Sequence, residues 1–329
     1  MIALLPSSIH WRLSGNGPPE VAIPGRPRWF LVTPVGRAQM GLEEMHSVGT
    51  LTGPFALKDG GVLAFSQMLI LRFPDSEAGS LDVVARGAAV TETLRRLRQA
   101  SGQASMPLDA MATVTPQPAP NYDASVRLDG ATIPGASFRT DLLDTAVTPA
   151  SLEVFSACSA EPRIHVDVML DAVHALVEGD IRKAILYSAI AVESLARASA
   201  AEGYDKIIAS PATPRHRVVD IPTAGGSVVR KDPIFENLGD DFVDYLHVRP
   251  LYLSGRSLQL EEPETYRRTM MLKNTRNGLA HVGNSEPDSR CLPLTREGAN
   301  DALRTAADVL RWLGDDHRYV IPGGGMRDA

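Results

Sequence analysis

Residues 271–283, MLKNTRNGLAHVG, bring together three side-chain types that can act on a phosphate group. Arg276 supplies a planar cation, Asn277 an amide, and His281 an imidazole that exchanges protons near neutral pH. Asn277 and His281 are four residues apart, so they lie on one face of a helix, and Lys273 precedes them by one turn. Arg276 sits at the edge of that face. The spacing predicts a phosphate-binding site beside a group that can move a proton.

The overall composition limits which proteins can carry such a motif. The chain has 329 residues, of which 44% are hydrophobic and 22% charged, enough for a substantial core and for two domains. The net charge of -6 argues against a protein that coats nucleic acid, because that affinity comes mostly from cations that neutralise phosphates. Nucleic-acid contact is therefore expected to be local.

The N-terminal segment and the hydropathy pattern predict a cytoplasmic protein with no membrane partner. The start, MIALLPSSIHWRL, lacks the cationic region of a secretory signal. The most apolar segment, GGVLAFSQMLILRF, contains Ser66 and Gln67 and is shorter than the roughly 18 apolar residues of a membrane span.

Other residues that could hold a metal or a cofactor form no recognisable site, and we expect neither. Cys158 and Cys291 are far apart and form no CxxC pair, so we interpret them as reduced, buried thiols. His165 and His174 have no metal-binding partner four residues along, so we interpret both as surface residues. GGSVVRK lacks the Lys-Ser/Thr of a phosphate-binding loop.

Residues 1–147 are rich in proline and glycine and have the composition of short strands, predicting a β-rich domain. Strands are predicted at 29–36 and 61–73. The segments FALKDGGVLAF and VRLDGATI each place Asp-Gly between apolar runs, which predicts two hairpins.

One helix is predicted within this half, over 88–100, where apolar residues recur at helical spacing. The arginines Arg95, Arg96 and Arg98 lie on its other side. We interpret them as a solvated face, although such a cluster could also contact RNA. TPQPAPNYD, residues 115–123, is predicted to be a loop.

From Thr148-Pro149, an N-cap followed by proline, the signals become helical, and we predict a helical domain over 148–320 with a flexible tail over 321–329. Helices are predicted at 150–158, from 164 onward, from Asp180 as a cap, from about 263, and over 295–316. Between them, 204–261 is predicted as an irregular insertion with one short helix over 232–247. The fold class is thus α+β with two domains.

Charged side chains in this half suggest further contacts. The helix that follows Asp180 is apolar on nearly every side, so Glu193 within it needs a partner, and Arg276 is the expected one. The cations of RHRVVD (215–220) and VVRKD (228–232) are interpreted as solvated loop charges rather than RNA contacts.

Two segments resemble the HEPN superfamily (higher eukaryotes and prokaryotes nucleotide-binding), whose members are small helical bundles in bacterial toxins, antiviral proteins and RNA-processing factors. RNGLAH is similar to the family's Arg, polar residue, three variable positions, His signature, near the end of a late helix. GDIRKAILYSAIAVESLARA is similar to its alanine-rich helix with an embedded glutamate. The resemblance covers about residues 150–320. It implies a metal-independent ribonuclease site at Arg276, Asn277 and His281, often completed across a dimer.

The motif and the resemblance together predict a bacterial endoribonuclease of toxin or antiviral-defence type, in which residues 1–147 form a β-rich sensor or adaptor domain of unknown type. Its catalytic residues are Arg276, Asn277 and His281, supported by Glu193 and Lys273. The predicted RNA-binding residues are Arg267, Arg268 and Lys273. A homodimer is expected because one chain supplies one motif histidine, and because a glycine inside the helix, Gly278, is most easily explained by a close backbone approach.

The alternative hypothesis is a non-catalytic HEPN-like module that binds a nucleotide, RNA or a partner protein as a sensor. In either case an antitoxin or another component of a defence system is a possible partner.

Overall fold

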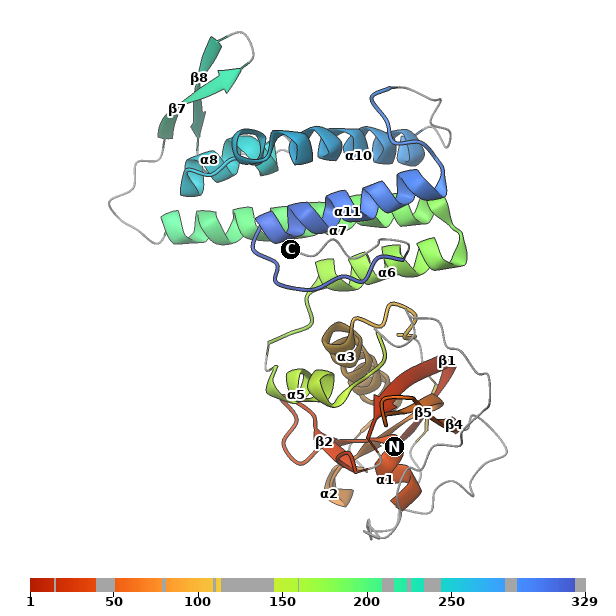
Figure 1. Ribbon diagram of the computed structural model, residues 1–329. Coiled ribbons are helices and arrows are strands. Elements are labelled where there is room, and N and C mark those ends of the chain that lie inside the picture. Colours follow the sequence, from red (N-terminus) through yellow and green to blue (C-terminus); the bar gives the residue numbers. More distant parts are fainter. Residues whose placement is uncertain are drawn as a thin grey trace. The chain divides into compact units, whose positions relative to one another are not determined.

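The structure is a computed structural model, and its contacts divide the chain into two compact units, Met1–Arg163 and Ile164–Ala329. It describes residues 1–14, 16–39, 51–78, 81–108, 111–113, 145–158, 160–208, 216–223, 226–233, 244–281 and 289–322. The architecture is an antiparallel sheet followed by helices (Figure 1), in agreement with the predicted α+β class. The division falls later than the predicted boundary after residue 147.

The first unit is built on a six-stranded sheet with the order β2-β3-β5-β1-β6, and β4 pairs with β5 beside this path. All of its strand pairs are antiparallel. The strands are β1 (Ile2–Leu13), β2 (Glu20–Ala22), β3 (Phe30–Val32), β4 (Leu51–Ala56), β5 (Val62–Arg72) and β6 (Met111–Thr113). The helices are α1 (Pro34–Gln39), α2 (Asp75–Ala78), α3 (Val83–Ser101) and α5 (Pro149–Ala157).

The predicted hairpin at FALKDGGVLAF is confirmed. β4 and β5 pair across it, with Ala56 opposite Val62. Gly60, in the turn, has φ +81°, in the left-handed region that glycine adopts without steric cost. The second predicted hairpin, VRLDGATI, and the predicted loop over 115–123 lie outside the described residues.

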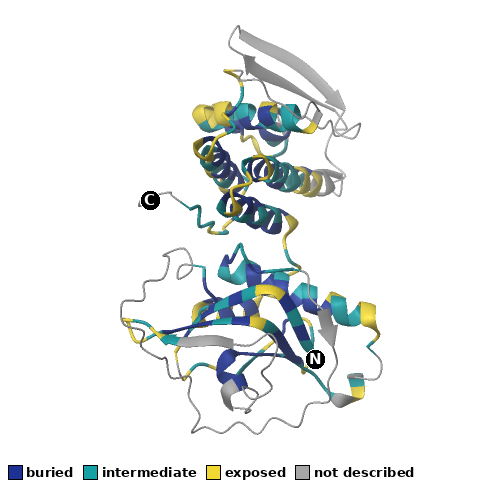
Figure 2. Cartoon of the chain, turned by 90° about the vertical axis from the view of Figure 1, so that its right-hand side faces the viewer, coloured by how far each residue is buried: buried dark blue, intermediate teal, exposed yellow. Residues whose placement is uncertain are grey.

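The core of the first unit combines the sheet with α3 and α5, and buried residues run through all of them (Figure 2). Val90, Leu94 and Leu97 of α3 are buried, as their spacing predicts. Leu152 and Phe155 of α5 belong to the same core. The helix predicted after Thr148-Pro149 is therefore present, and it packs in the core of the first unit.

The strand predicted over 29–36 is wrong in its second half. β3 ends at Val32, and α1 begins at Pro34. The Thr33 hydroxyl accepts a hydrogen bond from the Gly36 amide (3.3 Å) and donates to the Pro18 carbonyl (2.6 Å). Thr33-Pro34 thus starts a helix in the same way as Thr148-Pro149. The prediction missed this start because the neighbouring residues have the composition of a strand.

The arginine face of α3 is buried, contrary to the solvated face expected from its charge. Arg96 and Arg98 are buried, and Arg95 is partly buried. Arg96 donates to the carbonyls of Cys158 (2.9 Å) and Ala160 (2.7 Å), in the chain that follows α5. The chain that follows α5 thus covers this face of α3, and the guanidinium group supplies donors to its backbone carbonyls.

In the second unit, α7 is the central helix and packs against α6, α10 and α11. The elements are α6 (Ile164–Glu178), α7 (Ile181–Ile208), β7 (His216–Thr223), β8 (Gly226–Pro233), a π-helix (Asp244–Val248), α8 (Arg249–Ser254), α9 (Leu258–Glu261), α10 (Pro263–His281) and α11 (Arg296–Trp312). The predicted cap of α7 is confirmed, because Asp180 accepts a hydrogen bond from the Lys183 amide at 3.0 Å.

Among the described residues, one stretch, Ile181–Gly203, is long and apolar enough to cross a membrane by length and composition. This stretch belongs to α7. The core helix of a soluble protein passes the same test, and α7 packs against α6, α8, α10, α11 and the π-helix in the way that such a helix does.

The insertion predicted as irregular over 204–261 is largely regular. α7 continues to Ile208, and β7 and β8 form an antiparallel hairpin. The cations of RHRVVD from position 216 onward and those of VVRKD therefore lie on paired strands and not on loops. Of the helix predicted over 232–247, the first two residues belong to β8 and the last four to the π-helix, and residues 234–243 lie outside the described part.

Candidate functional site

The motif lies on the C-terminal half of α10, as predicted. Arg276 and Asn277 are partly buried, and Lys273 is partly buried one turn earlier. His281 is the last residue of the helix, and its side chain lies outside the described part of the structure. With 3.6 residues per turn, Lys273, Asn277 and His281 follow one stripe of the helix.

Arg276 is joined to α7 by the ion pair predicted from the sequence. Its Nη2 lies 3.0 Å from Oε2 of Glu193, and its Nη1 donates to Oδ1 of Asn277 at 3.0 Å. Only 11% of the Glu193 side chain is exposed, against 29% for Arg276. The carboxylate of Glu193 therefore holds one nitrogen of the guanidinium group, and the neighbouring amide oxygen of Asn277 holds the other.

Glu193 also binds a second cation, Arg197, which sequence reasoning missed. Arg197 Nη2 lies 2.7 Å from Glu193 Oε1, one turn further along α7. The signal was present in the spacing, because a glutamate four residues before an arginine on a helix forms an ion pair. Each carboxylate oxygen thus accepts from a different arginine, and the three side chains together carry a net charge of +1.

The end of α10 is held by contacts with residues 290–292. The Thr275 side chain is buried; its hydroxyl donates to the Met271 carbonyl (2.8 Å) and accepts from the Leu292 amide (2.7 Å). Asn274 Nδ2 donates to the Arg290 carbonyl at 3.1 Å. These bonds position the half of the helix that carries the motif.

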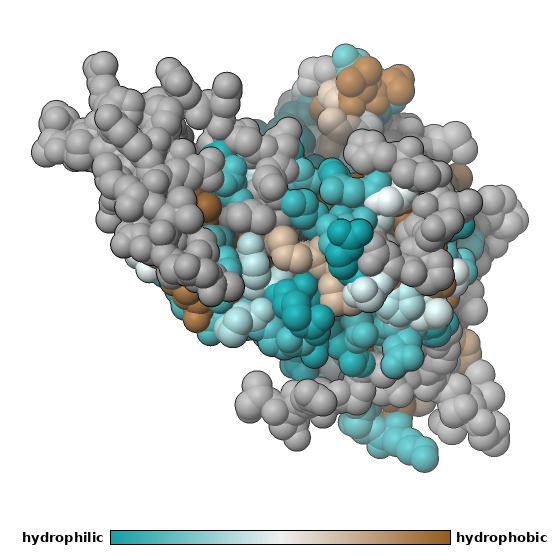
Figure 3. Space-filling model, turned by 90° about the horizontal axis from the view of Figure 1, so that it is seen from above, coloured by the Kyte–Doolittle hydropathy of each residue, from teal (hydrophilic) through white to brown (hydrophobic). Residues whose placement is uncertain are grey.

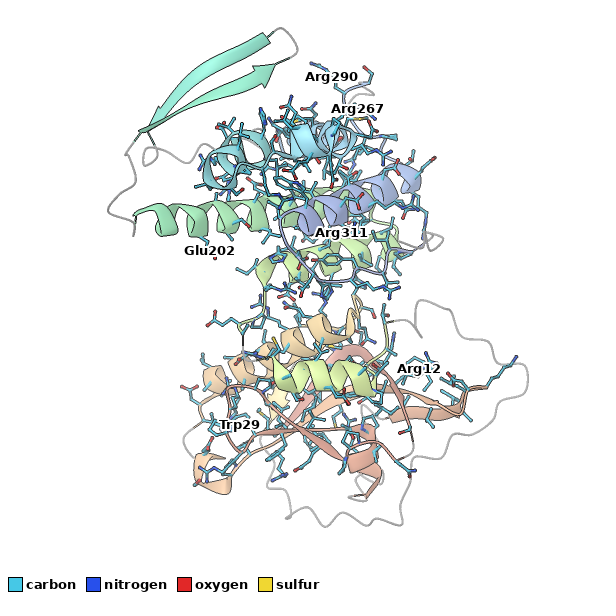
Figure 4. The ribbon with its side chains drawn as sticks, turned by 60° about the vertical axis from the view of Figure 1, so that its left-hand side comes forward. Arg12, Trp29, Glu202, Arg267, Arg290 and Arg311 are labelled. Atoms are coloured by element: carbon cyan, nitrogen blue, oxygen red, sulfur yellow. The ribbon has the colours of Figure 1, made fainter. Side chains whose placement is uncertain are left out.

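Arg267 and Arg268, predicted to bind RNA, are exposed on the N-terminal half of α10. Figure 4 shows Arg267 projecting outward from the helix, and Figure 3 shows the mainly hydrophilic face on this side of the second unit. Both arginines bind Glu264, at 2.8 Å and 3.0 Å. The hydrogen bond from Arg267, with the help of Arg268, lowers the pKa of Glu264 to about 2.

His165 is buried, which corrects its assignment to the surface. Its Nε2 lies 3.5 Å from Oδ1 of Asp315, and the Tyr319 hydroxyl donates to Oδ2 of Asp315 at 2.6 Å. Burial raises the pKa of Asp315, but the His165 imidazole beside it and hydrogen bonds from the Tyr319 hydroxyl and the His317 amide outweigh burial and lower the pKa to about 2. The contact between His165 and Asp315 holds the segment after α11 against α6.

Three further assignments change. His174, expected on the surface, is partly buried. The thiols, expected to be buried, are reduced, but Cys158 is exposed and Cys291 is partly exposed.

Within the described ranges, no group of three or more His, Cys, Asp or Glu side chains is placed to hold a metal ion.

The arrangement around Glu193 can bind an anion. Two guanidinium groups from two helices meet at one carboxylate, and planar guanidinium groups bind phosphate through two parallel hydrogen bonds. His281 follows Asn277 by four positions and ends the helix. Searches for a matching protein family, a similar curated protein and a similar solved structure find none.

Proposed function

We propose that this chain is a metal-independent endoribonuclease of toxin or antiviral-defence type, with a HEPN-like bundle in its helical part. The observation that carries the proposal is the ion pair between Glu193 and Arg276. This ion pair joins the two segments that resemble the family, which are far apart in the sequence. The first part of the chain is then a β-rich sensor or adaptor domain.

RNA carries its own nucleophile, so the site needs a base, an acid and a cation. The 2′-hydroxyl attacks the adjacent phosphorus, the bond to the 5′-oxygen breaks, and that oxygen takes a proton. His281 moves protons in this scheme, because imidazole titrates near neutral pH. Arg276 stabilises the charge on the pentacoordinate phosphorus, and Asn277 holds the guanidinium group in place.

A homodimer forms part of the proposal. One chain supplies one motif histidine, whereas the reaction needs both an acid and a base. Two copies of α10 that face each other would supply two. We place the protein in the cytoplasm with RNA as its substrate, and an antitoxin or another defence component as its partner.

A second function, a non-catalytic binding module, is favoured by one specific observation. Nη1 and Nη2 of Arg276 and Oδ1 of Asn277 are engaged within the protein, which suits a fixed recognition surface. In this case the same residues bind RNA, a nucleotide or a partner protein without cleavage.

The two functions are separated by an RNA cleavage assay with the purified full chain in excess EDTA. A 5′-labelled single-stranded RNA should be cleaved to products with 2′,3′-cyclic phosphate or 3′-phosphate ends, and a DNA of the same sequence should stay intact. His281→Ala should cleave on the order of 10²- to 10⁴-fold more slowly, and Arg276→Ala comparably, through loss of charge stabilisation.

Arg276→Lys serves as the matched variant, because an ammonium group keeps the charge but not the planar two-point contact. We expect it to rescue poorly. Thermal melting must show that each variant is folded. Wild-type protein without cleavage, or His281→Ala with wild-type rates, would leave the binding module as the function.

A further inference from the structure

Arg197 and Arg276 are brought together by a single carboxylate. Arg197 comes from α7 and binds Oε1 of Glu193 at 2.7 Å; Arg276 comes from α10 and binds Oε2 at 3.0 Å. Two guanidinium groups that share one carboxylate lie close to each other. Their mutual repulsion is offset by Glu193, and the net charge of +1 still attracts an anion.

The two arginine side chains are more exposed than the glutamate that they share. The exposed fraction is 11% for the Glu193 side chain, 29% for Arg276 and 47% for Arg197. The carboxylate is thus covered, whereas the two cations reach the surface. A phosphate in solution meets the guanidinium groups before it meets the carboxylate.

We propose that Arg197 is a phosphate-contacting residue of the same site, which binds the RNA backbone beside the phosphate held by Arg276. The inference rests on the proposed function for its ligand, RNA, and extends it by a residue outside the motif. Arg197 orients the strand across α7, while Arg276 acts at the phosphate that reacts.

A purely structural role explains Arg197 less well. The Arg197 side chain is 47% exposed, so solvent screens its charge and its ion pair with the residue four positions earlier adds little to stability. Arg311 on α11 offers the comparison: it binds Asp308, and not Glu193, at 3.0 Å on the surface of the same unit. If Arg197 serves only its helix, replacing either arginine should have the same small effect.

The test measures RNA binding by the full chain in the His281→Ala background, where cleavage is suppressed. Fluorescence anisotropy with a labelled single-stranded RNA is recorded over a series of salt concentrations. Adding Arg197→Ala should weaken binding by about tenfold or more, as expected for a lost charged hydrogen bond. It should also reduce the slope of log affinity against log salt by about 1, because one phosphate contact is lost.

Arg197→Lys should restore the salt slope but only part of the affinity, since it keeps the charge without the planar contact. Arg311→Ala is the matched control and should leave both quantities unchanged. An Arg197→Ala variant that binds with unchanged affinity and slope overturns the inference, as does an Arg311→Ala variant that weakens binding equally, or a parent that binds no RNA.

The cleavage assay separates this result from the proposed function. If the otherwise wild-type enzyme cleaves RNA while Arg197→Ala leaves binding unchanged, the proposed function stands and the inference fails. If the enzyme never cleaves but RNA binding depends on Arg197, the phosphate contact is correct and the binding module replaces the nuclease.

Discussion

In the N-terminal half of α10, Glu264, Arg267, Arg268 and Thr269 hydrogen-bond within their own helix. In the C-terminal half, polar side chains bond to other segments: Arg276 to Glu193 on α7, and Thr275 and Asn274 to residues 290–292. Both halves contain arginines paired with a glutamate. They differ in where the glutamate comes from and in how far it is exposed.

The difference shows what an arginine–glutamate pair can do at two places on one helix. Side-chain exposure is 59% for Glu264 and 11% for Glu193. The exposed pairs neutralise charge locally and are screened by water. The covered pair fixes a guanidinium group relative to a second helix. Position in the fold, and not residue type, therefore separates a surface pair from a positioning pair.

The largest expected effect is on catalysis. Glu193→Gln should slow RNA cleavage by about 10- to 100-fold, because a guanidinium group displaced by about 1 Å loses its alignment with the phosphate. Single-turnover kinetics at saturating RNA measure the chemical step. Glu264→Gln is the matched control and should cleave at the wild-type rate. Equal losses in the two variants would abolish the distinction between the halves.

The next effect is on stability and compares two buried threonines of α10. Thr275→Val leaves the Leu292 amide without its acceptor, which should cost about 1–3 kcal/mol. Thr269→Val removes only a donor to the Thr265 carbonyl of its own helix, which that helix already uses, and should cost less. Urea unfolding gives both values. A Thr269→Val variant as unstable as Thr275→Val would contradict the comparison.

Features that depend on local sequence signals could be predicted before the structure was known. The helices begun by Thr148-Pro149 and Asp180 were predictable because capping signals are local. The contact between Glu193 and Arg276 was predictable because a carboxylate on an apolar helix requires a partner. Arg197 was within reach of the same reasoning through its spacing from Glu193.

Other features depend on distant residues and could not be predicted in this way. Arg96 is covered by the chain after α5, where it donates to the carbonyls of residues 158 and 160, and the sequence of α3 alone does not reveal this contact. His165 is buried beside Asp315, which lies near the other end of this unit in the sequence. The rule that charge marks a solvated face fails wherever another part of the chain covers that face.

A third, smaller effect concerns pH and uses two carboxyl groups that share a pKa of about 2. The pKa of Asp315 is lowered from 3.8, so its charged form stabilises the fold above pH 4, and this contribution is lost as the pH falls toward 2. Asp315→Asn should therefore flatten the loss of stability between pH 4 and pH 2, measured by chemical denaturation.

Glu264→Gln should change the same curve less, although the pKa of Glu264 is equally low. Its partners, like Glu264 itself, are exposed, so solvent screens the pairs, whereas Asp315 is buried. A greater flattening by Glu264→Gln than by Asp315→Asn would show that exposure does not decide the outcome.

The smallest effect is expected for Asn274→Ala. This side chain bonds to the Arg290 carbonyl across segments, but it is exposed, so water replaces the lost donor. The free energy of unfolding should change by no more than about 0.5 kcal/mol. A loss as large as that of Thr275→Val would mean that contact between segments, and not burial, sets the energy.

The position of β5 in the first unit determines the order in which its sheet can open. β5 pairs with β1, β3 and β4, so both of its edges are hydrogen-bonded along much of its length. Partial unfolding can release β2 or β6 from the rims without disturbing it, but any opening that frees β5 also releases β4 and separates the β2–β3 pair from the β1–β6 pair. Its amides should therefore exchange with solvent deuterium most slowly in the unit, at a rate set by global unfolding.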